Sequence, residues 1–156
     1  MLLSVANFAY MPMLSAQTTE QFQPYFASLR NDRVNLRSGP GMQYVVEWIY
    51  QRKSLPVEVI NKYRDWLQIQ DMDKITGWVR QDQISTNRTV ITTAKTTVQS
   101  QNQQTSTPIV RLDAGVVLFV DHCQPAWCYI RIKDYLGWVN RGQVWGLYTN
   151  ETIEQK

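Results

Sequence analysis

Two stretches of the chain repeat each other, and this repeat restricts the fold more than any other feature of the sequence. Residues 65–79, DWLQIQDMDKITGWV, match residues 126–139, AWCYIRIKDYLGWV, with one residue fewer in the turn. The similarity continues on both sides: LPVEVI precedes the first copy as VVLFV precedes the second, and VRQDQIS follows the first as VNRGQVW follows the second. The chain therefore contains two copies of a unit of about sixty residues.

Each copy alternates apolar and polar residues in short runs. In the first copy, VEV, WLQIQ and ITGWV are separated by the polar turns NKYRD and DMDK. A period of two predicts half-buried strands, and no stretch has the period of 3.6 residues that an amphipathic helix requires. The tryptophans that recur between the copies (Trp66 and Trp127, Trp78 and Trp138) are predicted to pack in two small cores, because large rings fill limited volume efficiently. The prediction is an all-β chain of two tandem small β-barrels.

The run VNLRSGPG, residues 34–41, predicts a strand followed by a tight turn. A glycine-rich loop that binds phosphate needs a helix N-terminus behind it. The residues that follow, MQYVVEWIYQ, are instead β-branched or aromatic, and no Lys-Ser/Thr pair follows the glycines. The loop is therefore interpreted as the opening turn of the first barrel.

The polar stretch 86–107 separates the copies and could be a flexible linker. Its valines, isoleucine and threonines favour strand, and TTVQS stands where VNLRS stands in the first copy. We predict a short connection, then the opening strand of the second barrel, with a polar loop only from Gln101 to Thr107.

Both ends of the chain have a distinct composition. Residues 1–16 are uncharged and apolar and end in Ser15-Ala16, which fits a secretory signal peptide whose basic start is missing; the alternative is a buried N-terminal segment. The run is short for a membrane span, so none is expected in the mature chain. The predicted organisation is this signal, an N-terminal extension at 17–27, the first barrel at 28–86, a degenerate second barrel at 87–148, and a polar tail at 149–156.

Cys123 and Cys128 bracket QPAW. If strands flank this four-residue turn, the two cysteines lie opposite each other, close enough for a disulfide. The alternative is a pair of free thiols. With a signal peptide, the disulfide is preferred, because oxidised pairs persist outside the cytoplasm.

The elements RVNLRSGPG, LPVEVI, DWLQIQ, GWV and QIS together resemble the bacterial SH3-like domain family over residues 28–85. The second copy has lost the opening signature, and its later half resembles the partner domain of exported tandem members. The resemblance implies two SH3-like barrels that act as a binding or targeting module of the cell envelope. Such modules are often joined to peptidoglycan hydrolases, but after Leu147 only YTNETIEQK remains, so no catalytic domain and no cofactor are expected.

Catalysis within the barrels is not indicated. His122 and Cys123 are neighbours on a strand and point to opposite faces, so the imidazole could not easily deprotonate the thiol. The single histidine is expected to face solvent, and no second histidine or cysteine spacing indicates a metal site. Asp71 and Asp73 are interpreted as charged residues of a hairpin turn. The net charge of +3, without a Lys/Arg-rich run, argues against nucleic acid.

Aromatic residues without a counterpart in the second copy indicate a ligand groove in the first. Tyr44, Trp48 and Tyr50 would line it, with Arg37 and Arg52 available for a carboxylate. The alternative is that Trp48 lies inside the barrel and no groove exists. The preferred function is an exported, periplasmic, non-enzymatic module that binds a cell-wall peptide or an extended protein segment. The alternative function is a structural scaffold in which the packed barrels serve protein assembly. The sequence leaves the oligomeric state open.

Overall fold

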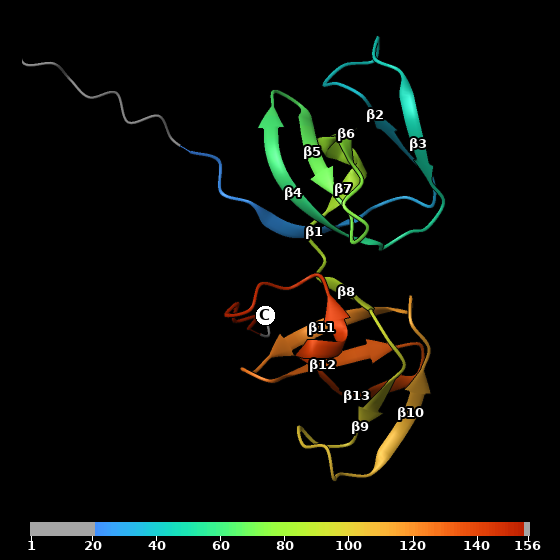
Figure 1. The fold of residues 1–156 in the computed structure, drawn as a ribbon, viewed down its shortest axis with the longest axis vertical. Coiled ribbons are helices and arrows are strands. Elements are labelled where there is room, and N and C mark those ends of the chain that lie inside the picture. The colour runs from blue at the N-terminus through green and yellow to red at the C-terminus, as the bar shows by residue number, and fades with distance from the viewer. Residues whose placement is uncertain (1–20, 155–156) are drawn as a thin grey trace, which may run out of the picture.

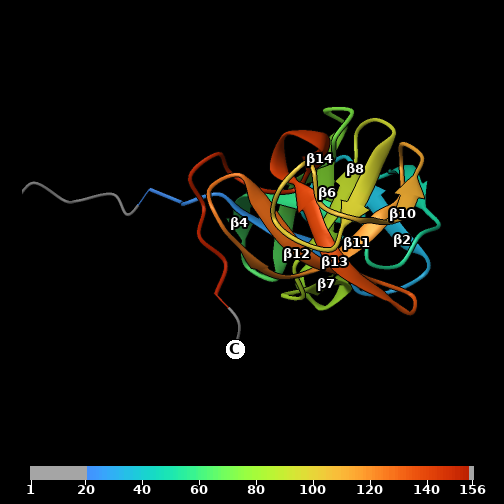
Figure 2. The ribbon, with the colours of Figure 1, turned by 90° about the horizontal axis from the view of Figure 1, so that it is seen from below.

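The structure is a computed structural model that describes residues 21–154. The predicted signal peptide at 1–16 lies outside these residues. Two domains follow each other along the long axis of the molecule, the first blue to green and the second yellow to red in Figure 1. Viewed along that axis in Figure 2, the strands of the second domain lie in front of those of the first. The chain thus forms two stacked β-sheet domains in tandem.

The first domain is one antiparallel sheet with the strand order β3-β2-β6-β5-β4-β1-β7. Its strands are β1 (Tyr25–Leu29), β2 (Val34–Arg37), β3 (Val46–Tyr50), β4 (Pro56–Tyr63), β5 (Trp66–Gln70), β6 (Thr76–Arg80) and β7 (Ile84–Ser85). A 3₁₀ turn, η1 (Gln81–Gln83), connects the last two. The alternation read from the sequence is present here, since every second residue of β5 is buried.

The second domain has the equivalent order, β10-β9-β13-β12-β11-β8-β14. Its strands are β8 (Thr89–Thr92), β9 (Thr96–Gln99), β10 (Pro108–Leu112), β11 (Val117–Cys123), β12 (Trp127–Ile132), β13 (Tyr135–Asn140) and β14 (Val144–Trp145), with the 3₁₀ turn η2 (Arg141–Gln143). The segment 86–107 holds β8 and β9, and β9 takes the place of β2. The predicted opening strand and polar loop of the second domain are therefore confirmed.

The prediction of an all-β chain is confirmed: residues 21–154 form strands, turns and two 3₁₀ turns, without an α-helix. The prediction of closed barrels is not. Each sheet has two edges, β3 and β7 in the first domain and β10 and β14 in the second. Closure would need a hydrogen-bonded ladder between these edges, and β7 and β14 are only two residues long and pair with β1 and β8 instead.

Two predicted boundaries also differ from the structure. Tyr25, Phe26 and Ala27, assigned above to an extension, belong to β1, because this strand pairs with both β4 and β7. The predicted polar tail contains Ile153, which packs against the second core and accepts a hydrogen bond from the Cys123 amide at 2.9 Å. Glu151 of the same segment forms an ion pair with Arg88, so apolar packing, a backbone hydrogen bond and an ion pair tie this segment to the domain.

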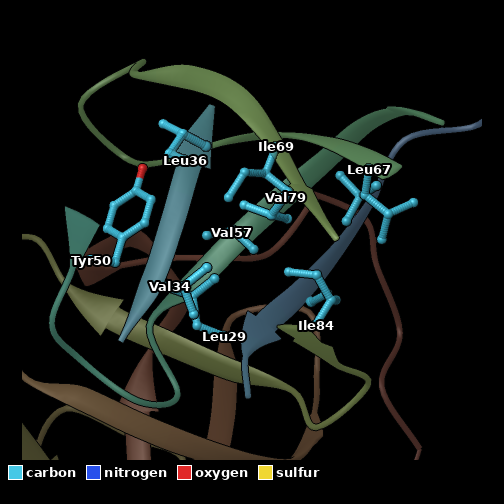
Figure 3. Packing of buried hydrophobic residues seen from close by; sticks show 11 residues of the cluster. Leu29, Val34, Leu36, Tyr50, Val57, Leu67, Ile69, Val79 and Ile84 are labelled. Carbon is cyan, nitrogen blue, oxygen red and sulfur yellow. The ribbon is translucent and has the colours of Figure 1, made fainter. Parts of the chain in front are cut away.

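Each domain has its own core. The first core is shown in Figure 3, where apolar side chains from several strands converge between the ribbons; it comprises Ala27, Leu29, Val34, Leu36, Tyr50, Val57, Val59, Leu67, Ile69, Val79 and Ile84. The second comprises Val90, Val98, Leu112, Leu118, Cys123, Cys128, Ile130 and Val139. Gly77 lets β6 cross closely over Leu36, since a Cβ there would lie 2.5 Å from the leucine Cγ.

The domains contact each other through aromatic side chains and hydrogen bonds. Phe26 of β1 is buried beneath Trp145 and Tyr148, with ring centroids 5.1 and 4.7 Å away. The Tyr148 hydroxyl donates to Glu58 Oε1 at 2.7 Å. The Thr89 hydroxyl donates to the backbone carbonyl of Ser54 at 2.8 Å. Because Phe26 is buried by the second domain rather than by its own core, these contacts fix one domain against the other.

Candidate functional site

Trp48 lies on the edge strand β3, and half of its surface is exposed. It is the direct cross-strand partner of the buried Leu36. Directly opposed residues point to the same face of a sheet, so Trp48 lies on the same face as the core residue Leu36. Unlike Leu36, Trp48 is not part of the first core, and its indole lies at the edge of that core. The alternative that Trp48 fills the first core is therefore wrong. An exposed tryptophan at the rim of a core is available for a ligand.

A pocket of about 200 Å³ lies against Trp48. Most of its lining is apolar, and two carboxylates complete it: Trp48, Tyr50, Leu55, Pro56, Asp71, Met72, Asp73, Ile75 and Ile91. Ile91 belongs to β8, so the second domain supplies one side of the pocket. We call this the Trp48 pocket. It offers apolar contact beneath a negatively charged rim, where Asp73 is exposed.

Tyr50 closes the floor of the Trp48 pocket as a core residue. Its ring is only 6% exposed, and its hydroxyl donates to Asp71 Oδ2 at 2.9 Å. Burial raises the pKa of Tyr50, and the hydrogen bond to Asp71 raises it further, so the hydroxyl stays protonated and donates. Asp71 Oδ1 accepts from the amides of Asp73 and Ile75 at 3.0 Å each. This carboxylate holds the β5–β6 turn and the tyrosine together, which confirms the structural interpretation of the turn.

Tyr44 and Arg37 organise the glycine-proline turn. The Tyr44 ring covers Gly39 so closely that a Cβ there would lie 2.5 Å from its Cδ1 atom. Arg37 Nη1 donates to the carbonyls of Tyr44 at 2.8 Å and Met42 at 3.2 Å. The first glycine therefore serves close packing of the ring, and the arginine ties the loop to β2.

The five residues predicted to form one groove do not lie together. Trp48 and Tyr50 line the Trp48 pocket, whereas Arg37 lines a different one on the outer face of the sheet. Tyr44 and Arg52 line neither, and both are exposed. Arg37 follows Leu36 in β2, and successive side chains of a strand point to opposite faces, so it cannot join the partner of Leu36. Their role in ligand binding stays a prediction.

The second domain carries smaller residues at the matching places. Val110 pairs with Val98 as Trp48 pairs with Leu36, and Leu112 takes the place of Tyr50. The aromatic side chains of the Trp48 pocket thus come from the first domain, although Ile91 of the second domain also lines it.

The second domain instead has an aromatic cluster that the sequence analysis missed. His122 stacks on Tyr129 at 5.4 Å and meets Trp138 edge-on at 5.2 Å, and its Nδ1 lies 2.9 Å from Asp121 Oδ2. The histidine is therefore half-buried among rings, and not fully solvent-facing as predicted. Register would have revealed the contact, because His122 pairs directly with Tyr129 and Tyr129 with Trp138.

The recurring tryptophans lie on the outer faces of the sheets. Trp66, Trp78, Trp127 and Trp138 are each half-buried and alternate with buried core residues along their strands. The prediction that they fill the cores is wrong, since aliphatic side chains take those positions.

The disulfide between Cys123 and Cys128 is confirmed. The two residues pair directly across the β11–β12 hairpin with their Cα atoms 4.1 Å apart. Cys123 points into the core while His122 joins the outer aromatic cluster, so the two side chains do not meet. A disulfide of this kind favours an extracytoplasmic protein.

Within residues 21–154, no three or more His, Cys, Asp or Glu side chains gather as a metal site would require. Over the same residues, no helix has the length and hydropathy needed to cross a membrane.

Comparison with known proteins identifies relatives of both domains. The family described as bacterial SH3 domain matches residues 30–86 and 100–146. A search of curated proteins found no significant match. Among solved structures, this chain is similar to NlpC2 from Trichomonas vaginalis, with 11% identity and a TM-score of 0.36 over 81% of this chain and 49% of that one. It is also similar to NlpC1 from the same organism, with 12% identity and a TM-score of 0.36 over 87% of this chain and 50% of that one. The chain spans about half the length of these two proteins.

Proposed function

The chain belongs to the bacterial SH3 domain family, and on that premise we propose that it is a non-catalytic binding module of the cell envelope, exported to the periplasm, that binds an extended cell-wall peptide in the Trp48 pocket. One observation carries the proposal: Trp48 is half-exposed over an apolar pocket to which both domains contribute. A rigid indole gives a peptide large contact area at small entropic cost.

The charges around the pocket support a particular kind of peptide. Asp73 is exposed beside apolar Met72 and Ile75, so the site offers a carboxylate at the end of an apolar surface. An ammonium group on an aliphatic stem matches this arrangement, because the stem packs on the apolar wall while the charge meets the carboxylate. The ligand is therefore a peptide with an amine-bearing side chain.

Binding to isolated cell wall tests the proposal. Trp48→Ala should lower the amount of protein that sediments with purified peptidoglycan by about tenfold, because a central aromatic anchor carries much of such an interface. Val110→Ala, the matching change in the second domain, should leave sedimentation unchanged. Melting temperatures of both variants separate lost binding from lost folding. Equal binding of wild type and Trp48→Ala would reject the pocket.

Spectra of the unaltered protein provide a test that does not depend on the variants. Adding a lysine-containing tripeptide should shift the indole signal of Trp48 and the amide signals of the β5–β6 turn. Saturable capture of one protein by the wild type, without retention on peptidoglycan, would instead favour an extended protein segment as the ligand.

Export is tested by the mass of the protein from its native cell fraction. We expect a mature chain that begins near Gln17, with neither thiol open to alkylation before reduction. A full-length mass with two free thiols would reject periplasmic location and with it the cell-wall ligand.

A scaffold role is the second candidate, and the domain interface favours it. Phe26, Trp145 and Tyr148 hold the two domains in one arrangement, so a larger assembly could recognise both at once. Phe26→Ala should then weaken assembly, whereas Trp48→Ala should leave assembly unchanged.

A further inference from the structure

The outer face of the first sheet carries a second pocket, separate from the Trp48 pocket, with a volume of about 230 Å³. Three arginines, two amides and two large apolar side chains line it: Arg33, Asn35, Arg37, Met42, Trp66, Arg80 and Gln83. None of these lining residues is acidic. We call it the arginine pocket, and none of the functions considered so far uses it.

The fold brings the three arginines together from separate parts of the sequence. Arg33 and Arg37 stand four residues apart around β2, so both point to the face opposite Val34 and Leu36. Arg80 ends β6, the neighbour of β2 in the sheet, and pairs directly with Trp66 of β5. Three cations and a half-buried indole thus meet over a small area.

Their charges are poorly compensated within the described chain. Arg80 Nη2 lies 3.3 Å from Asp82 Oδ2, and both side chains are more than half exposed, so this pair is weak. Asp82 is shared, because its Oδ1 accepts from Gln83 Nε2 at 3.1 Å. The bonds of Arg37 described above go to neutral carbonyls. Three like charges in one pocket repel each other until an anion neutralises them.

The arrangement is also preorganised. The carbonyls of Met42 and Tyr44 fix the Arg37 guanidinium by its Nη1 atom. A guanidinium held in one orientation loses little entropy when it binds a carboxylate or phosphate through parallel hydrogen bonds.

The second domain shows that the fold does not need these charges. Gln99 takes the place of Arg37, since each is the partner of its domain's second tryptophan, and Asn140 takes the place of Arg80 opposite Trp127. The Asn140 side chain accepts from the Gly142 amide and caps η2, whereas Arg80 gives η1 no such bond. Arginine at 80 therefore gives up a local stabilising contact that the same turn makes in the other domain.

From these observations we infer that the arginine pocket is an oxyanion-binding site, which takes a carboxylate or phosphate group carried on a small apolar or ring-bearing moiety. The oxyanion lies among Arg33, Arg37 and Arg80, and the rest of the ligand packs on Trp66 and Met42. The volume fits one such group rather than a whole polymer chain. The site lies on a different face from the Trp48 pocket. Anion binding there does not depend on whether the Trp48 pocket binds a peptide.

Titration of the intact protein with matched probes tests the inference. The probes are N-acetyl-Ala-Ala with a free carboxylate, the same dipeptide as its C-terminal amide, and inorganic phosphate, each followed by NMR shifts of the Trp66 indole and of the arginine Nε signals. At least one anion should bind saturably and more weakly as salt rises, while the amide should not. Carboxylate binding alone assigns a peptide terminus or organic acid; phosphate binding alone assigns a phosphorylated ligand.

The decisive variant is Arg80→Asn, because the second domain has asparagine, Asn140, at the matching position. It should fold as wild type and bind the anion about tenfold more weakly, as expected when one charged hydrogen-bond donor is lost. Lys62→Asn removes one exposed charge elsewhere on the same domain and should leave binding unchanged. Equal binding of amide and carboxylate with no phosphate binding, or equal loss in both variants, would overturn the inference.

The two variants test the proposed function and the arginine pocket independently. If Trp48→Ala abolishes retention on peptidoglycan but leaves anion binding intact, both assignments stand. If Arg80→Asn loses anion binding while Trp48→Ala keeps full retention on peptidoglycan, the proposed function is wrong and the arginine pocket remains.

Discussion

The first and second domains share one strand order but use matching positions differently. Where the first has Trp48 over an apolar pocket, the second has Val110; where the first has Arg37 and Arg80, the second has Gln99 and Asn140. The second adds a disulfide and the cluster around His122. Core positions are apolar in both domains, and the outer tryptophans recur in both, whereas these edge and outer positions differ. The first domain therefore supplies the whole lining of the arginine pocket and most of that of the Trp48 pocket.

The largest expected effect comes from the cores, where the two domains are alike. Leu36→Ala should lower the free energy of unfolding by about 2–5 kcal/mol, because it removes three carbons from a fully buried site. Val98→Ala, its counterpart, removes two and should cost about 2 kcal/mol. Urea unfolding followed by circular dichroism measures both. A smaller loss for Leu36→Ala than for Val98→Ala would show that the cores are not equivalent.

The second-largest effect is expected from the disulfide, which is present only in the second domain. Replacing Cys123 and Cys128 by serine should destabilise the second domain by roughly 2 kcal/mol, since the bond closes only a short loop in the unfolded chain. Amide exchange should accelerate in β11 and β12 and stay unchanged in β4 and β5. Reductant should then have no further effect on the serine variant, and any effect would point to another cause.

Tyr50 tests a contact that only the first domain makes. Tyr50→Phe keeps the buried ring but removes the hydrogen bond to Asp71, and it should cost about 1–2 kcal/mol because a buried carboxylate oxygen loses its donor. Thermal unfolding measures the loss. Leu112→Ile, at the matching place, serves as the control for disturbed packing; an equal loss there would remove the special role of the hydroxyl.

The smallest effect concerns the C-terminal segment of the second domain. Burial raises the pKa of Glu151, but the hydrogen bonds and charge of Arg88 outweigh it, so the pKa lies below its ordinary value of 4.5. The contribution of this pair is present above that value and is lost as pH falls through the lower pKa of the folded state.

Melting temperatures measured from about pH 5 to pH 3 should therefore fall more for the wild type than for Glu151→Gln. Glu154→Gln changes an exposed neighbour and should follow the wild type. Parallel curves for all three proteins would contradict the assignment of the shift to the Arg88 pair.

Much of the fold could be predicted because its signals are local. The repeat around Trp66 and Trp127 predicted two equivalent units, alternation predicted the strands, and the spacing of Cys123 and Cys128 predicted the hairpin disulfide. The candidate site was predicted less well. Arg37 was grouped with Trp48, although the strand period places Arg37 on the face opposite Leu36, and the pairing of Leu36 with Trp48 was not readable from either strand alone.

By itself the sequence determined the all-β class, the tandem organisation, the disulfide pairing and the aromatic asymmetry of the two copies, because period, spacing and composition act over a few residues. Only the tertiary structure decided that the sheets stay open, that Tyr50 is buried beside an exposed Trp48, that Arg33 and Arg37 meet Arg80, and that Ile153 packs on the second core. These outcomes depend on register between strands and on where a sheet ends. Both are set by contacts between residues far apart in the chain, which no local pattern encodes.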